Sequence, residues 1–342
     1  MKRISLSDAV EEYVDHRAVE RSLAKATVRG DRMTLKALEA EAEGILAGNL
    51  TEKHVRDMLR KKSELTPESY NCAVARLSSF FRYCRANGYM HPHVDLLAQV
   101  IRRKPVGREF LRLGAEEFPY LLDATDTERN RAIVAVGLYA FLRGGEMRSL
   151  NVSDLNLDRG TLRVTIHKGG GWVDQMPISQ ELDEELRAWM IRYTNGVDGP
   201  LNPDWPLFPG MRNRFAKGPG HEQALSFDPT RRVPTPEKIP QAALVQLGYD
   251  IRDVNDKSKR EGFHTLRRSG ARALFDSLVE QSYDGALRVV QAMLHHQQST
   301  TTERYLGLTL DRHKRDDLVH GKRMFPVANR GNVVPLRRIG NG

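Results

Sequence analysis

A short basic segment divides this chain into two regions with different hydrophobic patterns. The segment, Arg102-Arg103-Lys104-Pro105-Val106-Gly107-Arg108, surrounds a proline and a glycine with positive charges, which is typical of an extended linker. The chain has 342 residues, more than one ordinary core uses, and its 40% of hydrophobic residues can fill two cores. We therefore expect domains at residues 1–104 and 113–310, a basic linker at 105–112 and a C-terminal tail at 311–342. The linker is either a solvated connector or a strap that lies along DNA.

The first region has the pattern of a helical bundle from Ser5 to about Arg103. Apolar residues recur at helical spacing, and the expected helices have start signals. The clearest is Thr66-Pro67-Glu68, which supplies a cap, a proline at the first helical position and an acid in the first turn. The other expected starts are Ser5 or Ser7, a position near Thr27, and a position after Thr51. The helix that follows Thr66 is expected to stop near Asn87-Gly88. Four or so short helices would form a compact bundle.

The second region mixes helices with a β-hairpin. Residues 130–142 are apolar on most faces and predict a buried helix. Residues Thr161–Ile166 and Trp172–Ile178 have strand patterns, and the glycine-rich segment between them predicts a hairpin. Helical patterns return at residues 179–191, 236–247, 266–279 and 284–294. The expected fold class is therefore mainly α with a small antiparallel β-sheet.

The net charge of +9 favours a polyanionic partner, most simply a nucleic acid, although a merely basic soluble protein would carry the same charge. The two cysteines, Cys72 and Cys84, match neither a zinc site nor a redox pair. No apolar run approaches the ~20 residues that span a bilayer, and the N-terminus lacks the apolar segment of a signal peptide. We expect a cytoplasmic protein with no membrane partner.

Six residues spread along the second region suit the chemistry of a phosphodiester. Attack on a phosphodiester builds negative charge on the non-bridging oxygens, and two arginine forks can hold both oxygens. A phenol can form a covalent phosphotyrosine, which conserves the energy of the broken bond. The set needs no metal, and the sequence has no zinc motif, clustered acidic pairs or P-loop. The six candidate catalytic residues are Arg143, Lys168, His264, Arg267, His296 and Tyr305.

Each of these residues also has an ordinary structural explanation. Arg143 and Arg267 could be ion-pair partners at helix ends, and Tyr305 could fill the core beneath an amphipathic helix. Lys168 could be a solvated lysine in a flexible glycine turn. The functional interpretation therefore depends on the ordered series and not on any single member.

The series resembles that of the tyrosine recombinases, the integrase family of site-specific DNA recombinases. Arg143 with Glu146 resembles the family's first arginine box, and Lys168 occupies the hairpin as the family lysine does. His264-Thr265-Leu266-Arg267 matches the H-x-L-R box, and the interval from His296 to Tyr305 has the family length and a threonine-rich middle. The resemblance covers roughly residues 5–308.

Three positions depart from the family pattern. Phe141 and His295 stand where glycine is common, and Arg268 stands where histidine is often found. These departures leave the six catalytic identities intact, so they bear on local packing more than on chemistry.

The resemblance implies a helical core-binding (SAM-like) domain followed by an α+β catalytic domain. Tyr305 would attack the scissile phosphate to give a 3′-phosphotyrosine and a free 5′-hydroxyl, while Arg143 and Arg267 clamp the phosphate. Lys168 would protonate the departing 5′-oxygen, and the two histidines would orient the phosphate or move protons. The reaction would use no cofactor, neither ATP nor a metal.

The resemblance also implies partners. The first partner is double-stranded DNA with core sites. The second is three further copies of the chain, which would form a homotetramer that exchanges strands through a Holliday junction. A directionality factor is a further candidate. The C-terminal tail, with Val333-Val334-Pro335-Leu336, would dock on a neighbouring subunit or remain disordered. The residues expected to contact DNA are Lys25, Arg29, Arg102, Arg103, Lys104 and Arg268.

Four activities fit this pattern. Because the core-binding helices begin within the first ten residues, we expect a phage or mobile-element integrase without an arm-binding domain. The alternatives are a Xer/Cre-type resolvase, a type IB topoisomerase-like enzyme and a non-catalytic DNA-binding regulator.

Overall fold

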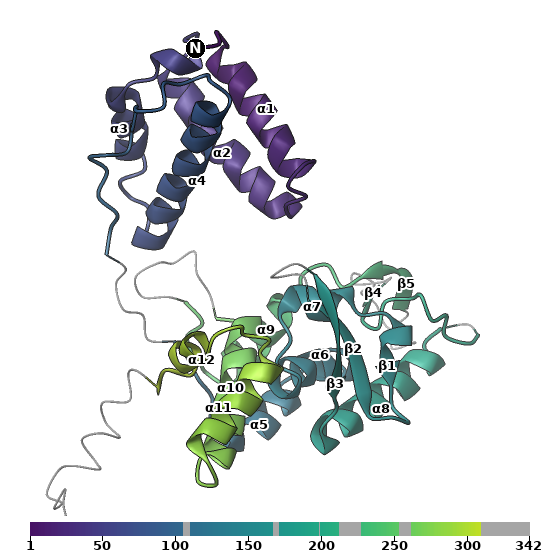
Figure 1. The fold of residues 1–342 in the computed structure, drawn as a ribbon. Helices are drawn as coiled ribbons and strands as arrows, with labels where there is room; N and C mark the ends of the chain where they lie inside the picture. The colour runs from purple at the N-terminus through teal and green to yellow at the C-terminus, as the bar shows by residue number, and fades with distance from the viewer. Residues whose placement is uncertain (105–109, 167–170, 198, 212–226, 253–260, 309–342) are drawn as a thin grey trace, which may run out of the picture. The chain divides into compact units, whose positions relative to one another are not determined.

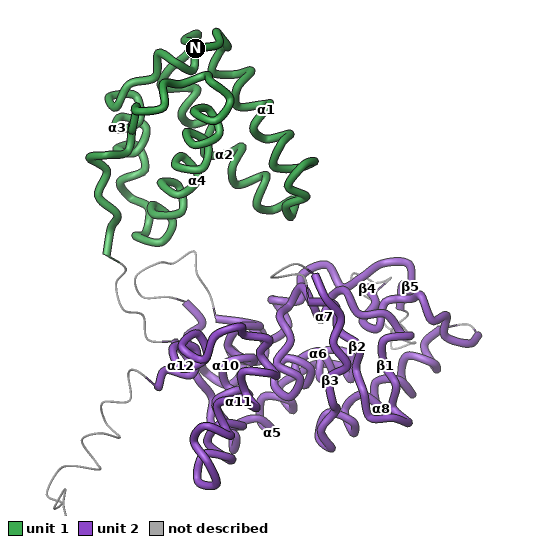
Figure 2. Tube along the Cα trace, viewed as in Figure 1, with its two compact units in different colours: residues 1–109 green, residues 110–342 purple. Residues whose placement is uncertain are grey.

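The computed structural model describes residues 1–104, 110–166, 171–197, 199–211, 227–252 and 261–308, which belong to two compact units (Figure 2). The first unit is residues 1–109 and the second is residues 110–342. Most of the expected linker and the whole expected tail lie outside the described residues. No described helix is long and apolar enough to cross a membrane.

The first unit is a bundle of helices whose starts follow the sequence signals. Ser5 caps α1 by accepting a hydrogen bond from the Asp8 backbone N–H at 3.0 Å, and Thr66 caps α4 in front of Pro67. The elements are α1 (Leu6–Ala18), α2 (Lys25–Glu41), a 3-10 turn (Ala47–Asn49), α3 (Glu52–Arg60) and α4 (Pro67–Ala86). The expected helix starts near Ser5, Thr27, Thr51 and Thr66 are confirmed within two residues or so.

The last helix of this unit ends where Asn87-Gly88 predicts, but the stretch from there to Arg103 is not helical. The last helix stops at Ala86 and is followed by Asn87-Gly88, where Gly88 has φ +75°. The prediction of helix to about Arg103 is wrong, because Pro92 and its neighbours form turns instead. Met90 and Leu96 in that stretch are buried against the bundle, so apolar spacing there reflects packing without a helix.

The second unit combines helices with two small antiparallel sheets (Figure 1). The strands and α8 gather on one side of this unit, and α10, α11 and α12 gather on the other. Its helices are α5 (Phe118–Asp123), α6 (Glu128–Tyr139), α7 (Gly144–Ser149), α8 (Gln180–Asn195), α9 (Lys238–Gln246), α10 (Phe263–Leu278), α11 (Tyr283–Met293) and α12 (Ser299–Leu306), with 3-10 turns at Ala115–Glu117 and Val152–Asp154. Its strands are β1 (Leu155–Asn156), β2 (Thr161–Ile166), β3 (Trp172–Pro177), β4 (Pro209–Met211) and β5 (Phe227–Arg232).

The predicted hairpin is confirmed. Strands β2 and β3 pair antiparallel, with Thr161 opposite Pro177 and Ile166 opposite Trp172, and β1 adds a third strand. The inward residues of β2 alternate with exposed ones, as the sequence pattern requires. The expected fold class, mainly α with a small antiparallel sheet, is also confirmed. The second sheet, β4–β5, was not predicted because its strands are short and lack clear alternation.

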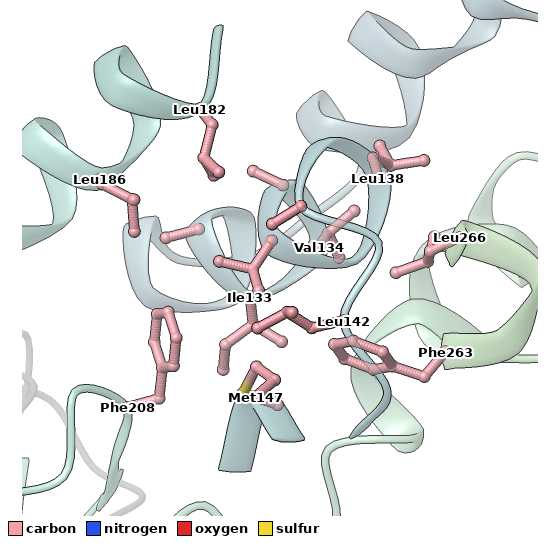
Figure 3. Close-up of a cluster of buried hydrophobic side chains, with 14 of the residues drawn as sticks. Ile133, Val134, Leu138, Leu142, Met147, Leu182, Leu186, Phe208, Phe263 and Leu266 are labelled. Carbon is pink, nitrogen blue, oxygen red and sulfur yellow. The ribbon is translucent and has the colours of Figure 1, made fainter. Parts of the chain in front are cut away.

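The α6 helix forms the centre of the second unit. It is buried on nearly every face, which explains why its sequence is apolar all round. Figure 3 shows its residues Ile133 and Val134 among side chains from α7, α8 and α10, including Met147, Leu186 and Phe263. Because α7 and α10 both pack on this helix, it fixes the two elements that carry Arg143 and Arg267.

The α6 and α10 helices approach so closely that glycine is required at their crossing. A Cβ atom at Gly270 would lie 1.7 Å from the backbone oxygen of Leu138 and 2.7 Å from the Phe141 ring. A backbone oxygen cannot move aside as a flexible side chain can, so a larger residue must push the two helices apart.

We expect Gly270→Ala to lower the free energy of unfolding of the second unit by about 3 kcal/mol or more, at or above the usual range for overpacked cores. All three tryptophans, Trp172, Trp189 and Trp205, lie in this unit, so their fluorescence during urea unfolding reports on it. The control is Gly145→Ala in α7, where a Cβ would meet no atom within 4 Å. Equal stability of the two variants would contradict close packing at Gly270.

Candidate active site

Arg143 is held at the start of α7 by the carboxylate of Glu146. It occupies the N-cap position, and Glu146 accepts hydrogen bonds from the Arg143 backbone N–H at 2.8 Å and from its guanidinium at 2.5 Å. The Glu146 side chain is buried, whereas that of Arg143 keeps 22% of its surface exposed. One end of the guanidinium is therefore fixed while the residue remains open to a ligand.

Arg267 lies in α10 as a fully buried charge. Its guanidinium donates hydrogen bonds to the backbone oxygens of Phe141 and Leu294, the latter at 2.6 Å, and lies 3.8 Å from the Glu146 carboxylate. Burial lowers the pKa of Arg267 to about 10, so the group stays charged at neutral pH. Glu146 thus lies between two arginines and offsets part of their repulsion.

Both carbonyl partners of Arg267 lie beside turns in the left-handed region. Phe141 has φ +52° and His295 has φ +54°, a conformation that favours glycine and costs other residues roughly 1–2 kcal/mol. These are the two positions where the family pattern commonly has glycine. The turns end α6 and α11 and bring the Phe141 and Leu294 oxygens to one guanidinium.

Tyr305 lies in α12 with its hydroxyl buried. Within the described residues the hydroxyl has no partner at hydrogen-bonding geometry, although the nearby Arg267 guanidinium favours its ionised form. Burial raises the pKa of Tyr305, and the charges of Arg267, Arg268 and Arg143 oppose that increase. The residue is therefore a neutral phenol next to a concentration of positive charge.

His296 contacts Tyr305 directly. The two rings meet edge to face with 5.4 Å between their centroids. The His296 Nδ1 lies 3.1 Å from the Thr302 hydroxyl, and the Gln291 side-chain amide donates to the His296 backbone oxygen at 3.0 Å. Thr302, from the threonine-rich interval, is fully buried and so orients the imidazole against the phenol.

His264 lies in the first turn of α10 and keeps an exposed face while the rest of the ring lies among protein atoms. Desolvation lowers the pKa of His264, and the positive charges of Arg267, Arg268 and Arg143 lower it further. The negative charge of Glu237 acts in the opposite direction and raises the pKa. The ring is consequently neutral at neutral pH and can accept a proton. The direction of the shift fits a group near a cluster of arginines.

The structure brings together five of the six candidate catalytic residues. Electrostatic and direct contacts connect Arg143, His264, Arg267, His296 and Tyr305. Lys168 lies outside the described residues, in the segment that connects β2 to β3. Glu146 is a site residue to which the sequence analysis gave no role. Its signal was an acid three residues after the helix start, the spacing of a capping box.

The residues expected to contact DNA differ in their surroundings. Lys25, Arg29, Arg102 and Lys104 are exposed in the first unit, as phosphate contacts require. The Arg103 guanidinium instead donates to the Ser63 and Leu65 backbone oxygens and lies over the Tyr70 ring, 3.8 Å from its centroid.

Arg268 is inside the second unit and not on its surface. Its side chain is 9% exposed, pairs with Glu261 at 2.6 Å and lies over the Phe110 ring. A buried guanidinium held in this way stabilises the base of α10, so a direct contact with DNA is not supported by its position.

Comparison with known proteins agrees with this geometry. A sequence model of the phage integrase family matches residues 112–311. The tyrosine recombinase XerC of Proteus mirabilis is 26% identical over 315 residues, which cover 89% of this chain and 90% of the relative.

Solved structures show the same fold. A lambda integrase dimer bound to a COC′ core site superposes with a TM-score of 0.63 and 17% identity, covering 96% of this chain and 81% of that one. A lambda integrase tetramer bound to a Holliday junction gives a TM-score of 0.63 and 18% identity, covering 87% and 79%. The family match spans more than half of the chain and contains every candidate catalytic residue. The chain therefore belongs to the phage integrase family and is a tyrosine recombinase, an enzyme of site-specific DNA recombination.

Proposed function

We propose that Tyr305 is the nucleophile of this recombinase, that the partly exposed Arg143 contacts the scissile phosphate, and that the buried Arg267 stabilises the phosphate charge from beneath. The observation that carries the proposal is the buried Tyr305 hydroxyl, which lies beside Arg267 and within the field of Arg143, two arginines joined by Glu146. Positive charge concentrated around a buried phenol suits a phosphate, which brings the negative charge that the arginines stabilise.

The proposed reaction has two balanced steps. The Tyr305 oxygen forms a bond to phosphorus, the bond between phosphorus and the 5′-oxygen breaks, and a free 5′-hydroxyl leaves. Neutral His264 is the candidate acceptor for the phenol proton, since its pKa is lowered, and Lys168 is the candidate donor of the proton to the 5′-oxygen. A 5′-hydroxyl then attacks the phosphotyrosine in reverse, which rejoins the strand and frees Tyr305.

The two arginines act on the charge of the transition state. Attack moves negative charge onto the non-bridging oxygens, and fixed guanidiniums stabilise that charge with little rearrangement. Arg143 is exposed enough to contact a phosphate. Arg267 is almost fully buried and adds its positive charge to the site from behind. Burial raises the pKa of Tyr305, so the phenol is protonated before the reaction begins.

We further propose that a tetramer of this chain exchanges strands between two DNA duplexes. One structural neighbour is a lambda integrase tetramer on a Holliday junction, which supports this assembly. Integration and Xer-type resolution are the two candidate biological roles, and similarity to XerC along most of its length supports the second. Two features favour an integrase over a Xer-type resolvase. They are the lengthened region from residue 203 to 259 and the C-terminal tail at residues 311–342. Covalent capture on genomic DNA distinguishes them, because an integrase attaches at the ends of an inserted element.

We expect the full chain to form a denaturant-resistant covalent complex with genomic DNA fragments, because the phosphotyrosine bond survives unfolding. Sequencing the captured fragments gives the target site, and a nicked duplex carrying this mapped site then serves as substrate. Tyr305→Phe removes the attacking oxygen and should abolish the complex. Tyr120→Phe, at an exposed tyrosine of α5, is the control that should retain it. A covalent complex formed by Tyr305→Phe would refute the assignment.

Arg143→Ala should slow cleavage of the mapped site by about 10²–10³-fold, because it removes one fixed charge from the transition state. DNA binding, measured by gel shift, should change little, and the fold should persist because the buried Glu146 keeps Arg267 at 3.8 Å as a partner. Arg267→Ala should lose cleavage and also stability, because it leaves the Phe141 and Leu294 oxygens unpaired. Arg148→Ala is the control on the same helix. Normal cleavage by Arg143→Ala would show that its charge is not used.

Lys168→Ala should cleave the mapped site slowly, yet recover on a substrate with a 5′-bridging phosphorothioate. A thiolate leaves without protonation, so a missing general acid no longer matters. Cleavage rates on the two substrates, compared with those of the unchanged chain, measure the recovery. If the defect is equally large on both, Lys168 is not the general acid.

A further inference from the structure

His295 makes a buried contact between two distant elements of the second unit. It follows the end of α11, and its side chain is 1% exposed. Its Nε2 lies 2.8 Å from the Asp174 carboxylate in β3, and its ring meets the Trp172 indole edge to face with 5.2 Å between centroids. Its Nδ1 is buried with no hydrogen-bond partner in the described parts of the chain, so Asp174 is the polar partner that the structure gives this ring.

The backbone at His295 does not favour a histidine. Its φ of +54° is in the left-handed region, where glycine has no steric penalty. The interactions that the side chain makes from this backbone are those with Asp174 and Trp172. Both partners belong to β3, so the ring attaches the turn to the hairpin.

The contact joins β3 to the end of α11, next to residues of the candidate site. Three consecutive residues at the end of α11 each reach a different part. The Leu294 oxygen accepts from Arg267, the His295 ring contacts Asp174, and the His296 ring contacts Tyr305. Strand β3 pairs with β2 along its whole length, and the chain between these strands contains Lys168.

We propose that the His295–Asp174 contact is a positioning contact that holds the β2–β3 hairpin against the end of α11. It fixes the distance between the hairpin and the turn that carries His296, so that the leaving-group proton donor and the nucleophile act in one geometry. The inference rests on the proposed role of Lys168. His295 itself touches no reacting atom in this arrangement.

The Asp174 carboxylate can serve the contact with His295 separately from the pairing of the strands. Asp174 is 36% exposed and lies opposite Val164 in the β2–β3 register, near the Trp172 end of the strand. A carboxylate there is not needed for sheet pairing, which uses the backbone. Loss of the contact should therefore loosen the hairpin's attachment to α11 while the strands stay paired.

The test compares His295→Gly, Asp174→Ala and the double variant on the mapped site and on its 5′-bridging phosphorothioate form. Glycine suits the left-handed backbone at residue 295, so the first variant removes the ring without straining the turn. The control is Ser22→Gly, which makes the same backbone change at φ +45° in the first unit.

We expect each single variant to cleave the oxygen substrate up to about 10²-fold more slowly, the effect of misplacing a catalytic group by about 1 Å. The double variant should be no slower than either single variant, because both changes break one contact. On the 5′-bridging phosphorothioate substrate, all three variants should approach the cleavage rate of the unchanged chain. The control Ser22→Gly should match the rate of the unchanged chain on both substrates.

Two outcomes would overturn the inference. Additive losses would show that His295 and Asp174 act separately, and equal losses on both substrates would show that the contact serves folding or the nucleophile instead.

Lys168→Ala in the same series separates the two proposals. If Lys168→Ala recovers on sulfur while the contact variants do not, the inference fails alone. If Lys168→Ala does not recover, the role of Lys168 fails and the inference fails with it.

Discussion

The buried charge of Arg267 is the interaction on which the candidate site depends. A guanidinium that is 1% exposed is stable only if carbonyls and a carboxylate replace the water it has lost. The Phe141 and Leu294 oxygens and the Glu146 carboxylate do so, and each comes from a different segment of the chain. One side chain therefore fixes the end of α6, the end of α11 and the start of α7.

This requirement explains two unusual residues. The carbonyls reach Arg267 because the chain turns through the left-handed region at Phe141 and at His295. The Phe141 ring packs with Phe275 and Leu306 in a small apolar cluster, and the His295 ring contacts β3. In each case the side chain of the residue in the left-handed conformation joins the turn to another element.

Burial and the charges of the arginines also set the protonation states of Tyr305 and His264. Desolvation keeps Tyr305 protonated, and the arginines limit that effect without reversing it. Their charge also lowers the pKa of His264, which keeps that ring able to accept a proton. A single buried carboxylate among the described residues, Glu146, pairs with both Arg143 and Arg267, so this cluster retains net positive charge for a polyanionic ligand.

The sequence by itself determined the helices and the hairpin, because their caps and hydrophobic periods are local signals. Ser5, Thr66 and the β2 pattern each predicted an element that the structure contains. It also supplied the catalytic candidates as an ordered series, since residue type and spacing are visible without coordinates. Contacts set by packing were not visible: no local pattern shows that Arg267 reaches Phe141 and Leu294, that Arg268 is buried against Glu261, or that His295 contacts Asp174. Only the tertiary structure decided these, because burial and partners depend on how α6, α10 and α11 pack. The partners lie from 7 positions apart, as for Arg268 and Glu261, to 126 positions apart, as for Arg267 and Phe141.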